Sequence, residues 1–394
     1  MRRMYAYRVV KGELRFDNTD DEEKILRLME QWRKAINDVE HREWHLSALP
    51  SHLQRTAKEH VEEQRKSMTA NGVRREPVLH EWLTQLYPQY VRFFENNFRQ
   101  VSLTTLEPKK PVVAEFRSRR WRLLRDALNS PTREGCEKRH VLEVCKPKLI
   151  YNTCDRKFYL IYAVRKLVSL PTEEELEKLL NEGFNVVGAD INLDDVTYAV
   201  FHLSNGGAKR LHTGRCRWGI GEWIRVSRID AFAKRHHGTS ASRHWMRLKR
   251  RSAAKAGEAA NEIVNTAKRF DAKAIVYEKL SDKFPKKGED YNYKMHMWFH
   301  RRTMRYLVNN AGWEGLAAFP VQAWETSSRC PRCNAKLPKP STKSHRDWQV
   351  RRCGRCGFTD DRDHIACANI ARKFYVRLLR LRLRNILPQM TTHR

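Results

Sequence analysis

The sequence lacks any long apolar segment. No run of apolar residues approaches the roughly 20 that a membrane-spanning helix requires, and no apolar stretch typical of secretory signals follows Met1-Arg2-Arg3. Internal repeats and long low-complexity segments are absent as well. These absences argue against a membrane protein or a secreted one. They favour a soluble, cytoplasmic protein whose thiols stay reduced.

Acidic residues are scarce relative to basic ones. The 394 residues include 77 Lys and Arg but 46 Asp and Glu, a net charge of +31. Such an excess repels itself and attracts polyanions, so nucleic acid is the expected partner. A basic ribosome-associated or membrane-surface protein is the alternative, but 41% hydrophobic residues and 11 Trp favour sizeable cores. The length suits about two to four domains.

Cysteine is also infrequent, yet four of the nine cysteines form two CxxC pairs near the C-terminus: Cys330, Cys333, Cys353 and Cys356. Thiolates at this spacing can close a tetrahedral cage around one Zn²⁺. Four such ligands leave no open position, so the predicted site is structural. The remaining cysteines fit no common zinc spacing and are expected to be free thiols: Cys136, Cys145, Cys154, Cys216 and Cys367.

The first part of the chain is expected to combine a small barrel with helices. Residues 4–16 are typical of two strands turning at Lys11-Gly12, and residues 140–170 contain further strands that could pair with them. Between these segments, apolar residues at helical spacing predict helices near 20–36, 52–68, 77–98 and 113–128. An acidic helix opening at Pro171-Thr172 is expected to link to the next domain.

The second part of the chain has the pattern of an α/β domain. Apolar strand segments and helical segments alternate along it. Strands are predicted at 184–193, 196–203, 208–213, 272–280 and 315–324, and helices at 221–269, 291–311 and from about 363.

Three carboxylates in this part are candidate catalytic residues. Asp190 and Glu278 interrupt or end apolar strands, where a charge is costly unless it is paired or bound to metal. Asp363 begins a helix. Singly, each has an ordinary explanation as a turn residue, a surface charge or a helix cap. Together, in a ribonuclease-H-like sheet, they would converge and hold two Mg²⁺ about 3.5–4 Å apart.

The motifs around these residues resemble those of the TnpB family, transposon-encoded RNA-guided nucleases related to compact type V CRISPR effectors. The first acidic motif is Gly188-Ala189-Asp190-Ile191-Asn192 and the second runs from Ile275 to Leu280. Thr326-Ser327 precedes the first CxxC, and the third acidic motif runs from Asp361 to Ile370. Asn192, Ile365 and Cys367 depart from the family pattern, which puts metal geometry and rate in question but leaves the three acids intact.

The resemblance implies a multidomain α+β protein with a RuvC-like nuclease domain. Its layout would be a wedge barrel (1–16 and 137–170) with an inserted helical recognition lobe (17–136), a linker helix (171–184), the nuclease domain (185–324), a zinc ribbon (325–360), and a final nuclease helix with a basic tail (361–394). It implies that the partners are a guide RNA and target double-stranded DNA with a short flanking motif, and that no membrane is involved. It also implies a protein of the prokaryotic cytoplasm that binds each guide RNA as a monomer or a homodimer.

A basic segment suits nucleic-acid contact. Residues 234–255 contain no acid. A solvated helix face is the ordinary explanation, but unbalanced positive charge fits a nucleic-acid backbone. The predicted contact residues are Lys234, Arg235, Arg243, Trp245, Arg247, Lys249, Arg250 and Arg251. Two other functions stay open: a guide-directed repressor that binds without cutting, and a guide-independent nuclease for branched DNA.

Overall fold

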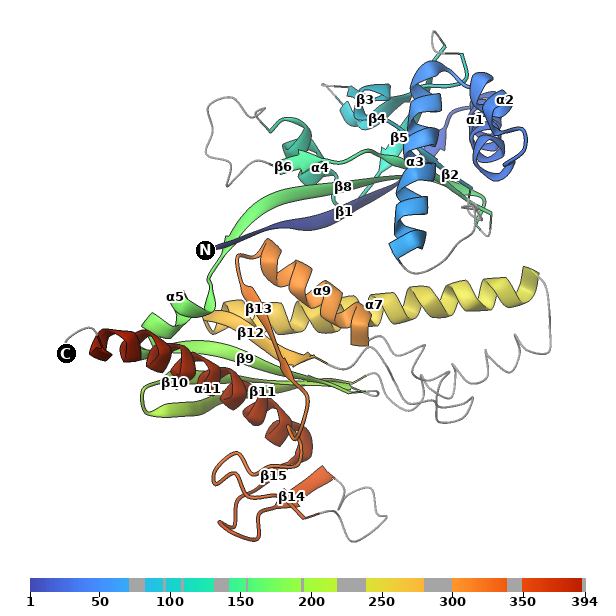
Figure 1. Ribbon diagram of the computed structural model, residues 1–394. Coiled ribbons are helices and arrows are strands. Elements are labelled where there is room, and N and C mark those ends of the chain that lie inside the picture. The colour runs from blue at the N-terminus through green and yellow to red at the C-terminus, as the bar shows by residue number, and fades with distance from the viewer. Residues whose placement is uncertain are drawn as a thin grey trace. The chain divides into compact units, whose positions relative to one another are not determined.

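The computed structural model describes residues 1–70, 82–94, 97–107, 110–130, 142–153, 155–192, 195–217, 239–279, 300–338 and 349–391. The chain divides into two compact units (Figure 1). One comprises Tyr7–Leu167, and the other Met1–Ala6 with Val168–Arg394. In the described parts, no helix combines the length and apolar character needed to cross a bilayer.

The unit Tyr7–Leu167 is built on a curled eight-stranded sheet with the order β2-β7-β8-β1-β5-β4-β3, in which β6 pairs with β8. Its elements are β1 (Arg2–Phe16), α1 (Thr19–Asn37), α2 (Arg42–Ser47), α3 (Ser51–Ala70), β2 (Trp82–Gln85), η1 (Pro88–Tyr90), β3 (Val91–Phe94), β4 (Asn97–Leu103), β5 (Val112–Arg117), α4 (Trp121–Leu128), β6 (Leu142–Val144), β7 (Lys148–Asn152) and β8 (Lys157–Leu170). The predicted pairing of the N-terminal strand with segment 140–170 is confirmed, because β1 lies beside β8.

Two predictions for this unit are wrong. In the described part of the predicted helix 77–98 (82–94 and 97–98), strands β2 and β3 and the start of β4 are found instead, and the helix at 113–128 is strand β5 followed by the short α4. In β5 the buried Val112, Ala114 and Phe116 alternate with less buried residues, which is the two-residue period of a strand. The block between the outer strands is therefore only partly helical.

The predicted turn at Lys11-Gly12 is also wrong, since β1 is one continuous strand. Gly12 serves packing here rather than a reversal of the chain. A Cβ atom on it would lie 2.0 Å from the ring of Phe116, which packs against the strand from β5. Glycine is often found in a strand where another group approaches the backbone this closely.

The second unit contains a five-stranded sheet with the order β11-β10-β9-β12-β13. Strands β9, β10 and β11 are antiparallel, and β12 and β13 run parallel to β9. This is the ribonuclease-H-like arrangement that the sequence predicted. The elements are α5 (Glu173–Lys178), η2 (Leu179–Asn181), β9 (Phe184–Ile191), β10 (Asp195–Ser204), β11 (Gly207–Arg217), α7 (Thr239–Arg269), β12 (Ala272–Lys279), α9 (His300–Trp313), β13 (Ala317–Gln322), β14 (Val350–Arg352), β15 (Thr359–Asp361) and α11 (Arg362–Thr391).

Helices cover both faces of this sheet (Figure 1). On one face, Val187, Ala189 and Tyr277 pack with residues of α7 and α9. On the other, Val186 and Val276 pack with residues of α11. Because side chains alternate along a strand, the even-numbered residues of β9 and β12 point toward α11. The capping box of Thr172 and Glu175 starts the predicted acidic helix α5.

Candidate metal centres

The sheet register brings two of the predicted carboxylates together. Strands β9 and β12 are parallel neighbours, and Ala189 pairs with Tyr277. Asp190 and Glu278 therefore stand one residue further along adjacent strands, at their carboxyl ends. Both have even numbers, so both point to the face covered by α11. Both are buried, with relative exposures of 6% and 9%.

The third predicted carboxylate, Asp363, lies in the first turn of α11. Its backbone N–H donates to the carboxylate of Asp361 at 2.8 Å, which caps the helix start. The negative charges of Glu278 and Asp363 both raise the pKa of Asp190, so the three groups act on one another electrostatically. The structure thus places all three predicted residues around one end of the sheet.

Burial and like charge make these carboxylates hard to ionise. Burial raises the pKa of Asp190, and the charges of Glu278 and Asp363 raise it further. Burial also raises the pKa of Glu278 and of Asp363. Clustered acids with raised pKa values are typical of sites whose charge is balanced by a bound cation.

The residues suit hard divalent cations such as Mg²⁺. The ligands would be carboxylate oxygens, and Oε1 of Glu278 is buried without a hydrogen-bond partner. Among the described residues, the acids are not a group whose ligand atoms all lie within 4.8 Å of one another. Carboxylates that surround two ions about 3.5–4 Å apart have no need to meet so closely. Asp190, Glu278 and Asp363 are the residues that would hold the ions.

Two departures from the family pattern lie around Asp190. The amide of Asn192 donates to Oδ2 of Asp190 at 2.9 Å. The buried Cys367 thiol donates to the carbonyl of Thr197 at 3.3 Å, and burial raises the pKa of this thiol. The third departure, Ile365, is buried with Cys330 and Cys353. It joins the start of α11 to the core of the cysteine-rich module.

A glycine sets how close α11 comes to the sheet. A Cβ atom on Gly188 would lie 2.6 Å from the backbone oxygen of Cys367, which cannot rotate away. We therefore expect Gly188→Ala to push α11 from β9 and to lower the free energy of unfolding by about 1–3 kcal/mol. Urea denaturation measures this loss. Gly206→Ala is the matched control, because only the Ser204 hydroxyl lies near that position, at 3.7 Å. Equal stability of the two variants would contradict the close approach.

Stability should respond to pH and Mg²⁺ together. The native pKa values of Asp190, Glu278 and Asp363 are raised, so their protonated forms stabilise the fold at low pH. This contribution is lost as the pH rises through the raised values. We expect the increase in Tm on adding Mg²⁺ to be larger at about pH 8 than at about pH 5. Calorimetry of the zinc-loaded protein with and without Mg²⁺ measures it. An increase that does not change with pH would contradict the charge cluster.

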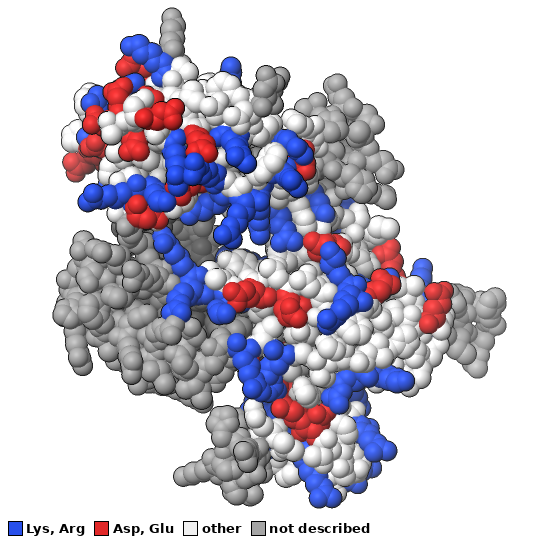
Figure 2. All heavy atoms as spheres, turned by 180° about the vertical axis from the view of Figure 1, so that it is seen from behind, with Lys and Arg blue, Asp and Glu red and all other residues white. Residues whose placement is uncertain are grey.

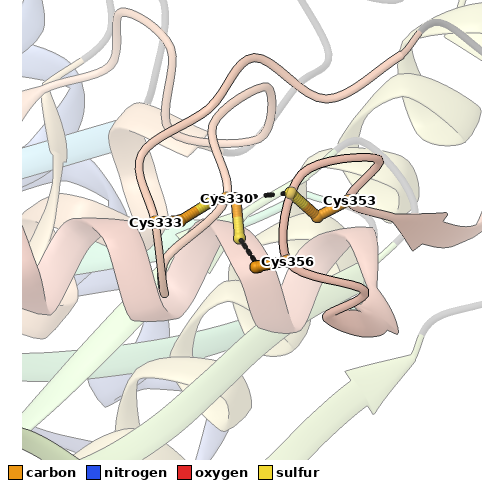
Figure 3. Close-up of side chains that lie close together, drawn as sticks. All are labelled: Cys330, Cys333, Cys353 and Cys356. Atoms are coloured by element: carbon orange, nitrogen blue, oxygen red, sulfur yellow. Dashed lines mark hydrogen bonds between the residues drawn. The ribbon is translucent and has the colours of Figure 1, made fainter.

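The four predicted zinc ligands come together in the structure (Figure 3). The Sγ atoms of Cys330 and Cys356 are 3.6 Å apart, and those of Cys333 and Cys353 are 3.5 Å apart. Ligands about 2.3 Å from a tetrahedral Zn²⁺ lie about 3.8 Å from one another, so the sulfur positions fit this ion. The backbone N–H groups of Cys356 and Arg355 lower the pKa of the Cys353 thiol to about 6.

The two CxxC turns are built alike. The N–H of Asn334 donates to the carbonyl of Cys330 at 2.9 Å, and the N–H of Gly357 donates to that of Cys353 at 3.0 Å. Asn334 and Gly357 both have positive φ, at 61° and 70°. Asn and Gly are the residues that tolerate this conformation best. Strands β14 and β15 form the small sheet of this module.

Helix α11 ties the cysteine module to the acidic site. The buried amide of Asn369 donates to the backbone oxygens of Thr326 and Arg329, both at 2.7 Å. Arg329 precedes the zinc ligand Cys330. The hydroxyl of Thr326 interacts with Glu278 and lowers the pKa of that carboxyl. One side chain of α11 thus holds the short segment from Thr326 to Arg329, which directly precedes Cys330.

A groove of about 1180 Å³ opens beside the end of β12. Its lining is aromatic and basic, and Trp324 is 72% exposed. The lining also includes basic residues from β12 and α11: Lys279, Arg372, Lys373, Arg377 and Arg380. Cations next to an exposed indole are typical of surfaces on which single-stranded nucleic acid stacks. Figure 2 shows lysine and arginine side chains spread over one face of the molecule.

The predicted nucleic-acid contacts are described only in part. Arg250 and Arg251 are exposed on α7. Arg243, Trp245, Arg247 and Lys249 belong to the same helix, but their side chains lie outside the described residues, as do Lys234 and Arg235 entirely. These eight residues remain predictions.

Sequence reasoning missed several residues of the site. Arg215, Asp195 and Asn369 all touch the acidic cluster or the segment beside it. Neither Asp195 nor Arg215 belongs to a motif that the sequence alone brings out. Once the register of the hairpin is known, the pairing of Arg215 with Thr197, and of Thr197 with Asp190, indicates that Arg215 lies beside the acidic site.

Comparisons with known proteins give one family match and several distant structural matches. Residues 300–370 match the model "Cas12f1-like, TNB domain". A complex of Cas12f1 with sgRNA and target DNA is 10% identical, with a TM-score of 0.38, and the match covers 92% of this chain and 98% of that one. CasPhi-2 (Cas12j) bound to crRNA is 11% identical with a TM-score of 0.40, covering 70% of this chain and 61% of that one. T. thermophilus RuvC with a Holliday junction is 15% identical, with a TM-score of 0.24, covering 50% and 96%. A search of curated proteins finds no match.

Proposed function

We propose that this protein is an RNA-guided DNA endonuclease of the TnpB type, encoded by a transposon and related to compact type V CRISPR effectors. The observation that carries the proposal is the placement of Asp190, Glu278 and Asp363 at one end of a ribonuclease-H-like sheet, where burial raises the pKa of each. The family match over residues 300–370 supports it. Guide RNA and target double-stranded DNA with a short flanking motif are the proposed partners.

In the proposed reaction, Asp190, Glu278 and Asp363 would hold two Mg²⁺. Bound Mg²⁺ supplies charge for the attacking and leaving oxygens of an in-line displacement. The amide of Asn192 keeps Oδ2 of Asp190 fixed, and the Thr326 hydroxyl lowers the pKa of Glu278. The basic groove beside β12 holds the strand to be cut. Four cysteines would bind one structural Zn²⁺, and the domain ranges from residue 171 onward are those predicted from the sequence.

The test begins with the RNA that copurifies with the protein. The RNA is sequenced, and a DNA library containing its complement beside randomised flanks is then offered with Mg²⁺. We expect cutting of the matching DNA next to one short flanking motif. Guided binding without cutting in Mg²⁺ or Mn²⁺ would favour a repressor. Cutting of a four-way junction after RNase treatment would favour a guide-independent nuclease.

A further inference from the structure

Arg215 lies in line with the acidic site across three strands. In the sheet register, Arg215 of β11 pairs with Thr197 of β10, and Thr197 pairs with Asp190 of β9. Side chains that are directly opposite in antiparallel strands share a face. Arg215 therefore points to the face covered by α11, as Asp190 does.

The guanidinium of Arg215 bridges two elements. Its Nη2 contacts Oδ1 of Asp361 and Oδ2 of Asp363, both at 2.9 Å. Its Nε donates to the hydroxyl of Thr197 at 2.9 Å and lies 3.4 Å from Oδ2 of Asp195. The side chain is 13% exposed. One planar, permanently charged fork thus joins the β hairpin to the first turn of α11.

These contacts give Arg215 a particular place in the charge balance. The surrounding carboxylates are Asp190, Asp195, Glu278, Asp361 and Asp363. Arg362 and Lys373 also act on this cluster electrostatically. Burial raises the pKa of Glu278, and the positive charges of Lys373 and Arg362 offset part of that rise. Asp195, Asp361 and Asp363 each form an ion pair with Arg215.

We infer that Arg215 is a positioning residue that supplies the internal counter-charge of the acidic cluster and fixes Oδ2 of Asp363, which leaves the other oxygen available to the cations that the cluster would hold. This inference rests on the proposed function, and no motif of the sequence indicates it. It has two consequences. First, without the guanidinium the carboxylates repel one another more strongly, which lowers stability in the absence of metal. Second, a positive charge that opposes cation binding is gone, while Asp363 is no longer held in position.

The first test is unfolding of the zinc-loaded protein in buffer depleted of Mg²⁺ and Mn²⁺. We expect Arg215→Gln to lower Tm, whereas Arg215→Lys should keep most of the wild-type Tm because it retains the positive charge. The double variant Arg215→Gln with Asp361→Asn should recover part of the lost Tm, because a repelling negative charge is removed. Arg210→Gln is the matched control: Arg210 lies on the same strand and pairs with Asp360, but its side chain is 40% exposed. Equal losses in Arg215→Gln and Arg210→Gln, or no recovery with Asp361→Asn, would overturn the counter-charge role.

The second test measures Mn²⁺ binding, by electron paramagnetic resonance of the free ion, together with cutting. We expect Arg215→Gln to bind Mn²⁺ roughly threefold to tenfold more tightly, because a repelling charge is gone, yet to cut about tenfold or more slowly at saturating Mn²⁺. If Arg215 were needed only for folding, its replacement would weaken Mn²⁺ binding and slow cutting together. That result, or an unchanged Mn²⁺ affinity, would overturn the positioning role. Wild-type protein that takes up no Mn²⁺ would refute the proposed function, while the unfolding test still decides the counter-charge role.

Discussion

Asp190→Asn should reduce cutting by more than about a hundredfold while guided binding to DNA persists. The substitution keeps the shape of the side chain and its contact with Asn192, but it removes one negative charge from the group that would hold the cations. Burial and the neighbouring negative charges raise the pKa of Asp190. Removal of its carboxylate charge therefore also relieves repulsion within the cluster. We therefore expect the Tm of the metal-depleted variant to equal or exceed that of the wild type.

Cutting and binding are measured on the same guide-loaded preparation, by gel assay and by filter binding. Asp271→Asn is the matched control, because Asp271 belongs to the same unit but its side chain is 87% exposed. Asn tolerates the positive φ of that position, 46°, at least as well as Asp. Undiminished cutting by Asp190→Asn would remove the basis of the proposed function, and loss of DNA binding would show that the substitution acts through the fold.

The fold of the unit that comprises Met1–Ala6 and Val168–Arg394 could be predicted well because its strands are long apolar segments with clear ends. Strands β9, β10 and β12 lie close to their predicted positions. The other unit was harder, since β2, β3 and β5 have only four to six residues. Over such lengths, alternation and helical spacing share most of their apolar positions. Tertiary pairing with β1 and β7 decides in favour of strands there.

The acidic residues and the cysteines could be predicted for a different reason. A carboxylate within an apolar strand, or two CxxC pairs, is visible in the local sequence. The role of Arg215 is not, because it follows from the pairing of Arg215 with Thr197 and of Thr197 with Asp190. The role of Asn369 likewise depends on how α11 packs beside the segment that contains Thr326 and Arg329. Local patterns identify the ligands, and the residues that hold them in place emerge from contacts between distant segments.

The zinc module should depend on its metal for folding. Within its described residues, the core of this module contains four buried residues: Cys330, Leu337, Cys353 and Ile365. So small a core cannot offset the entropy of ordering its loops, whereas a structural Zn²⁺ contributes about 10–16 kcal/mol in isolated fingers. Cys353→Ser removes the thiol with the lowered pKa of about 6. We expect its zinc content, measured by mass spectrometry, to fall from about one ion per chain to near zero.

Loss of zinc should also lower the cutting rate at the acidic site. The carbonyl of Arg329, next to Cys330, and the carbonyl of Thr326 share the amide of Asn369. Release of the first knuckle frees this segment and withdraws the Thr326 hydroxyl that acts on Glu278. We expect Cys353→Ser to cut at least about tenfold more slowly at saturating Mg²⁺. Cys145→Ser is the control, since that half-buried thiol lies outside the cluster. A zinc-free variant that cuts at the wild-type rate would show that the two centres are independent.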